Sequence, residues 1–179
     1  MNIFELSQEK HNTFKSIQSQ LYETKKPSDF DKIVFWEKSS PYADEDKHLY
    51  DIIDPVLTNC YSLLDNLGIK DYTKNKYCLE FQQKNCYGQE KYNWLSWHYD
   101  DYGAVNYKVY TVLYYLRKDK TIEGGNLQYK INQNLLEYSI QEKDVLLFKG
   151  DLEHCPTLTS GFGSRDLIAC FIERIESCY

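Results

Sequence analysis

The hydrophobic pattern of the chain changes near residue 75, and this change limits the folds open to it. Before that point, apolar residues recur at helical spacing over residues 4–22 and again over residues 46–67, with residues 33–36 as a short strand between. Ser7 suits the N-cap of the first helix, and Gly68 suits the end of the second. After residue 75 the chain reads as a series of short strands. This order predicts a mainly β fold with N-terminal helices and a double-sheet jelly-roll core.

The length of 179 residues suits one domain, in which residues 1–74 form a helical support and residues 75–179 form the β core. The net charge of −6 argues against binding nucleic acid by phosphate neutralisation. The first residues lack the apolar segment of a secretory signal, and no apolar run is long enough to span a membrane. Six cysteines without a CxxC pair then favour reduced thiols. We therefore expect a cytoplasmic protein with no nucleic-acid or membrane partner.

Residues of a metal-binding type stand at two places in the β-rich part. His98 and Asp100 are two residues apart in a predicted strand, so their side chains share one face. His154 follows a buried-looking strand over residues 144–148 and a short turn, which can bring it opposite that pair. Two histidines and one carboxylate are the ligand set of non-haem iron(II) oxygenases. The three residues alone could still hold any of several metals.

Each of these features also has an ordinary explanation. A His-x-Asp triplet often arises by chance, and a single histidine is usually structural. Arg165 opens an otherwise apolar strand, where an arginine is most often a surface charge. The functional alternative is that its guanidinium clamps a carboxylate through two parallel hydrogen bonds, which its geometry suits well. The joint pattern is more specific than its parts, and it predicts a metal beside a bound carboxylate.

Five sequence blocks together resemble the prolyl 4-hydroxylase-like branch of the Fe(II)- and 2-oxoglutarate-dependent dioxygenases. They are His98-Tyr99-Asp100, YTVLYYL at 110–116, EGGNL at 123–127, DVLLF at 144–148, and the segment from His154 to Arg165. The resemblance covers roughly residues 77–174 and is loose over the N-terminal helices. It implies a double-stranded β-helix, a jelly-roll or cupin-like fold.

The same resemblance implies a role for each site residue. His98, Asp100 and His154 would ligate Fe(II), and Arg165 would pair with the distal carboxylate of 2-oxoglutarate.

Three further residues have expected roles in co-substrate binding. Tyr115 falls where a tyrosine of some members hydrogen-bonds that same carboxylate. Thr111 lies on the same strand face as Tyr115 and is expected to line the pocket. Tyr87 falls where a tyrosine of these enzymes often approaches the iron or the substrate.

The implied activity is hydroxylation of a C–H bond with release of succinate and carbon dioxide. The implied cofactors are Fe(II), 2-oxoglutarate and O2, with ascorbate as a candidate further cofactor. A prolyl residue in a protein or peptide is the first expected substrate, and a free amino acid or other small metabolite is the second. The alternative from a different functional class is a jelly-roll protein that binds a metal without catalysing a reaction. The carboxylate clamp argues against it, because a purely structural metal tends to have a closed ligand shell.

Overall fold

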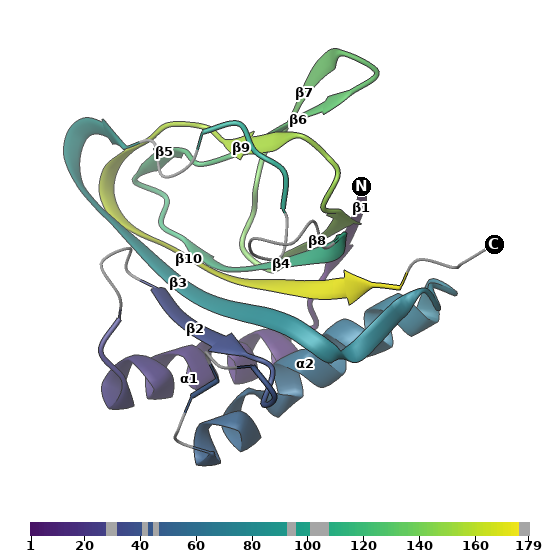
Figure 1. The fold of residues 1–179 in the computed structure, drawn as a ribbon. Coiled ribbons are helices and arrows are strands. Elements are labelled where there is room, and N and C mark those ends of the chain that lie inside the picture. The colour runs from purple at the N-terminus through teal and green to yellow at the C-terminus, as the bar shows by residue number, and fades with distance from the viewer. Residues whose placement is uncertain (28–31, 41–42, 45–46, 93–95, 101–107, 176–179) are drawn as a thin grey trace.

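The computed structural model describes residues 1–27, 32–40, 43–44, 47–92, 96–100 and 108–175, without the side chains of residues 89–92. It shows three layers (Figure 1). Helices α1 (Gln8–Thr24) and α2 (His48–Asn66) lie against one face of a larger sheet, and a smaller sheet lies over the other face. None of the described helices is long and apolar enough to cross a lipid bilayer.

The larger sheet is antiparallel and has seven strands. Its strands are β1 (Asn2–Glu5), β2 (Lys32–Trp36), β3 (Tyr72–Tyr92), β4 (Val109–Lys118), β5 (Ile122–Gly124), β8 (Asp144–Lys149) and β10 (Thr159–Arg174). They run in the order β1-β8-β4-β10-β3-β2, with β5 joined to β10. The smaller sheet is β7-β6-β9, made of β6 (Leu127–Ile131), β7 (Asn134–Tyr138) and β9 (His154–Pro156).

Strand β4 separates two hydrophobic cores by the alternation of its side chains. Val112 and Tyr114 belong to the core between the sheet and the helices, where the ring of Phe14 meets Tyr114 edge-on at 5.2 Å. Leu113 and Tyr115 belong to the core between the two sheets. Because neighbouring strand residues face opposite ways, the strand that anchors the helices also lines the space between the sheets.

The predicted jelly-roll core with N-terminal helices is confirmed by this pair of antiparallel sheets. Ser7 caps α1 as expected, since its side chain accepts a hydrogen bond from the backbone N–H of Lys10. The helix starts later than predicted because the residues before it form β1 along the edge of β8, where Asn2 lies opposite Leu147. The first 74 residues thus contribute strands β1 and β2 and the start of β3 to the larger sheet, as well as both helices.

Candidate metal and carboxylate site

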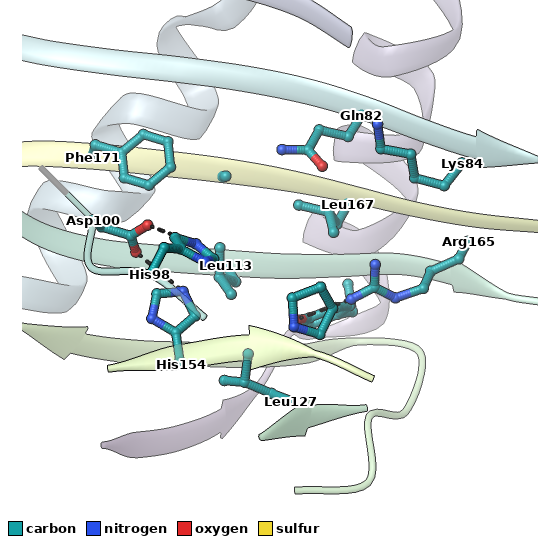
Figure 2. A pocket seen from close by; sticks show the side chains of 13 residues that line it. Gln82, Lys84, His98, Asp100, Leu113, Leu127, His154, Arg165, Leu167 and Phe171 are labelled. Atoms are coloured by element: carbon teal, nitrogen blue, oxygen red, sulfur yellow. Dashed lines mark hydrogen bonds and ion pairs between the residues drawn. The ribbon is translucent and has the colours of Figure 1, made fainter. Parts of the chain in front are cut away.

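A cavity of about 70 Å³ lies between the two sheets. A space of this size can hold several water molecules or part of a small polar ligand. Figure 2 shows His98, Asp100 and His154 at one end and Arg165 at the other. Apolar side chains of the larger sheet, including Leu113 and Leu167, lie between the two ends. The polar groups are therefore separated into two clusters along a single cavity.

The first cluster brings three acceptor groups together. Nε2 of His98 lies 3.5 Å from Oδ1 of Asp100, and Nε2 of His154 lies 3.5 Å from Oδ2 of the same carboxylate. One ligand atom from each of the three residues lies within 4.8 Å of the others. The structure thus brings the three predicted metal ligands, which come from two distant segments of the chain, together at one end of the cavity.

Backbone hydrogen bonds hold the two segments together. His98 and His154 form an isolated antiparallel bridge, in which each N–H donates to the other's carbonyl at 3.0 Å. The N–H of Asp100 donates to the carbonyl of Gly150 at 2.9 Å. A Cβ at Gly150 would lie 2.2 Å from the Asp100 carbonyl oxygen, so only glycine permits this approach. The sequence placed His98 and Asp100 in a regular strand, whereas the described part of that segment pairs only through this bridge.

The orientation of both imidazole rings is set by backbone carbonyls. Nδ1 of His98 lies 2.7 Å from the Ser96 carbonyl oxygen, and Nδ1 of His154 lies 2.9 Å from that of Leu152. A carbonyl accepts only from a protonated nitrogen, so a neutral ring carries its proton on Nδ1 and presents the Nε2 lone pair. Burial lowers the pKa of His154, although Asp100 opposes this, and the neutral form is thereby favoured.

These three groups suit a divalent metal ion. Two Nε2 lone pairs facing carboxylate oxygens repel one another unless a cation lies among them. Thr111 donates a hydrogen bond of 2.7 Å to Oδ2 of Asp100, a support that orients a ligating carboxylate. Thr111 thus contacts the acceptor cluster through Asp100.

The second cluster consists of Arg165 and Tyr115. Nη2 of Arg165 lies 3.5 Å from the hydroxyl of Tyr115, and the guanidinium lies over the Tyr115 ring at 5.2 Å. Both side chains are buried. Burial raises the pKa of Tyr115, so its hydroxyl remains a donor at neutral pH. The pair offers hydrogen-bond donors to an anion.

Arg165 has an N–H group that can still donate a hydrogen bond, as far as the described residues show. Its Nε is buried and has no hydrogen-bond partner there, and no described acidic side chain forms an ion pair with it. A Cβ at Gly125 would lie 3.0 Å from Cδ of Arg165, so the glycine lets the β6 side of the cavity approach the arginine closely. A buried guanidinium is ordinarily paired, which indicates a carboxylate ligand at this end.

Tyr87 is not brought to this cavity. It lies opposite Phe162 in the β3–β10 register, whereas Arg165 lies opposite Lys84, an odd number of residues away on the strand. Tyr87 therefore faces away from the cavity, and 74% of its surface is exposed.

Sequence reasoning missed two polar residues that line the cavity, Gln82 and Lys84 on β3. The alternation of β3 places both on one face, but the sequence does not say which strand lies beside them. Their register against β10 brings them to the cavity, with Gln82 opposite Leu167 and Lys84 opposite Arg165.

Comparison with known proteins finds likeness in structure. No protein-family model and no curated protein sequence matches the chain. A prolyl 4-hydroxylase from Phytophthora capsici aligns over 96% of this chain with a TM-score of 0.69 and 16% identity. This chain covers only 58% of that protein's length. A Pseudomonas putida prolyl-4-hydroxylase aligns over 98% of this chain and 92% of its own, with a TM-score of 0.65 and 12% identity.

A 2OG-Fe(II) oxygenase family oxidoreductase from Burkholderia pseudomallei aligns over 94% of this chain and 80% of its own, with a TM-score of 0.65 and 13% identity. The described fold thus defines a jelly-roll protein with a His-Asp-His cluster between its sheets. More narrowly, the chain has the fold of the 2OG-Fe(II) oxygenases in the form seen in prolyl 4-hydroxylases.

Proposed function

We propose that this protein is an Fe(II)- and 2-oxoglutarate-dependent dioxygenase that hydroxylates a C–H bond. The observation that carries the proposal is the division of one cavity into a cluster of acceptors and a cluster of donors. The first suits a divalent metal, and the second suits the distal carboxylate of a dicarboxylate co-substrate. With these bound, Fe(II), 2-oxoglutarate and O2 supply the oxidation, and succinate and carbon dioxide leave.

The residues of the chain have distinct tasks in this proposal. His98, Asp100 and His154 bind the metal from one side and leave its other positions to ligands. Arg165, assisted by the Tyr115 hydroxyl, fixes the far end of the co-substrate and so sets its orientation. The apolar side chains between the two clusters, among them Leu113 and Leu167, keep water from the reacting atoms.

The prime substrate we propose first is a prolyl residue in a protein or peptide. Its support is the likeness of fold to prolyl hydroxylases, one of which, from Trichoplax adhaerens, was solved with a fragment of hypoxia inducible factor. A free amino acid or other small metabolite is the second candidate.

One experiment tests the reaction class against a non-catalytic metal-binding module. Fe(II) and 2-oxoglutarate are added without oxygen, and a weak visible charge-transfer absorption is expected when both bind the same metal. Oxygen is then admitted with prolyl peptides or free amino acids, and we expect succinate release and a product heavier by one oxygen atom. Metal binding without the absorption and without succinate would leave the non-catalytic alternative and remove the dioxygenase.

A further inference from the structure

One lysine contacts the residues that directly precede the two histidines of the acceptor cluster. Lys130 lies on β6, and its Nζ donates a hydrogen bond of 2.7 Å to Oε1 of Glu153. The same Nζ lies over the ring of Trp97, at 4.3 Å from the ring centroid. Trp97 precedes His98, and Glu153 precedes His154. Lys130 therefore joins the two segments that carry the histidines, which are distant in the sequence.

Lys130 makes these contacts on the outer face of the smaller sheet. Leu127 of β6 lines the cavity, so Lys130, three residues further along the strand, faces the opposite way. The backbone N–H of Lys130 donates to the carbonyl of Glu153 at 3.0 Å, which keeps the two residues side by side. His98 and His154 line the cavity on the other face (Figure 2). The lysine thus holds both segments from behind and leaves the metal position open.

The acceptor cluster needs such a hold before a metal binds. The described backbone of the segment with His98 and Asp100 bonds to the rest of the chain at two places, the bridge to His154 and the bond to Gly150. The hydroxyl of Thr111 adds a bond to the Asp100 carboxylate. Without a cation, the ring lone pairs and the carboxylate repel one another across 3.5 Å. A contact that joins the two segments opposes this repulsion.

We propose that Lys130 is a positioning residue, which keeps the segments of His98 and His154 at the separation that a metal requires. This inference rests on the proposed function and concerns how its metal site stays assembled. Trp97 is 36% exposed, and the side chains of Lys130 and Glu153 are 38% and 27% exposed. Because solvent screens such contacts, together they should favour the assembled site by only roughly three- to tenfold. Metal affinity falls in proportion to the fraction of protein in which the ligands are assembled.

Amide hydrogen exchange of the metal-free protein measures this hold directly. The N–H groups of His98 and His154 donate to each other's carbonyls, so they exchange when the two segments separate. In Lys130→Met both amides should exchange roughly three- to tenfold faster than in the wild type. Amides of β4, at the centre of the larger sheet, should keep their rates. Lys130→Arg retains a cation for both partners and should keep most of the protection.

Titration calorimetry with Mn(II) tests the consequence for the metal site. Lys130→Met should bind Mn(II) more weakly by roughly the same factor, and Lys130→Arg should bind nearly as the wild type does. Lys74→Met is the matched control. Lys74 also lies over an aromatic ring, that of Tyr61 at 5.3 Å, but neither residue lines the cavity. This variant should have wild-type affinity for Mn(II).

A double-mutant cycle tests whether Lys130 acts through Trp97. Trp97→Leu and Lys130→Met remove the same contact, so the double variant should lose less Mn(II) affinity than the product of the two single losses. Losses that multiply would overturn the proposal, because Lys130 would then not hold the segment of His98 through this ring.

Two other results would also overturn the positioning role. One is unchanged exchange of the His98 and His154 amides in Lys130→Met. The other is faster exchange with wild-type Mn(II) affinity, which would leave Lys130 a structural residue only. Failure of the wild type to bind Mn(II) would instead remove the proposed function, and exchange in the metal-free protein would still decide whether Lys130 joins the two segments.

Discussion

The two ends of the cavity are built in different ways. The acceptor end joins a segment outside the regular strands, with His98 and Asp100, to the short strand β9 through a few backbone hydrogen bonds. The donor end stands on β4 and β10, two long strands paired along most of their length. The contrast indicates that a metal would help to hold the first end together, whereas the second is in place before any ligand binds.

The two ends of the cavity also differ in the kind of charge that a bound ligand would neutralise. At the acceptor end, lone pairs of three groups face one another, and a cation would stabilise them. At the donor end, a buried guanidinium has no described acidic partner, and an anion would stabilise it. Substitutions at the two ends should therefore separate metal binding from co-substrate binding.

The largest expected effect is on metal affinity in His154→Ala. Loss of one of three ligands should weaken Fe(II) or Mn(II) binding by more than about a hundredfold, beyond the loss typical of a supporting residue. Anaerobic metal titration measures this, and circular dichroism checks the fold. His48→Ala, an exposed histidine outside the cavity, should titrate like the wild type. Equal metal affinity in His154→Ala would remove the metal site from this cluster.

Arg165→Gln should be the complementary variant at the donor end. We expect 2-oxoglutarate affinity to fall by roughly one to three orders of magnitude, since a buried charged pair would be lost, while metal affinity stays nearly constant. Arg165→Lys should lose less, because it keeps the charge but not the two-pronged geometry. Calorimetric titration of the Mn(II) form measures both.

The same variant tests whether Arg165 serves stability. The ligand-free protein should not lose free energy of unfolding in Arg165→Gln, because a buried cation with no described acidic partner is replaced by a neutral side chain. Urea denaturation measures this quantity. A clear loss of stability would indicate that Arg165 has a structural role instead.

Thr111→Val should produce a smaller effect at the acceptor end. The variant removes the hydrogen bond to Asp100 and should weaken metal binding by roughly ten- to a hundredfold, as expected for a group that orients a ligand. Thr111→Ser keeps the hydroxyl and should bind nearly as the wild type does. If Val and Ser behave alike in metal titration, the hydroxyl does not support Asp100.

The smallest effect concerns pH. Burial lowers the pKa of His154, so the unfolded chain takes up a proton there at a higher pH than the folded, metal-free protein. The free energy of unfolding should therefore decrease as the pH falls below about 6.5, the ordinary histidine value. Urea denaturation at several pH values should show this slope, and a smaller one in His154→Gln. An equal slope in both proteins would assign the pH dependence to other groups.

Much of the fold followed from the sequence because helix and strand periodicities are local. The ranges of α1 and α2 were predicted to within a few residues, and residue type and order singled out His98, Asp100, His154 and Arg165, which the structure brings to one cavity. Strand β1 was missed because its pairing with β8 is a contact between distant segments. The expected regular strand through His98 was replaced by a single bridge for the same reason.

Residue types and their order along the chain determined the jelly-roll class and predicted a two-part site for a metal and a carboxylate, because ligand chemistry and strand periodicity belong to the residues themselves. Only the tertiary structure decided which side chains share the cavity. The β3–β10 register turns Lys84 toward Arg165 and Tyr87 toward solvent, and a shift of one residue would exchange the two faces. Register depends on packing between distant strands, and local sequence does not contain it.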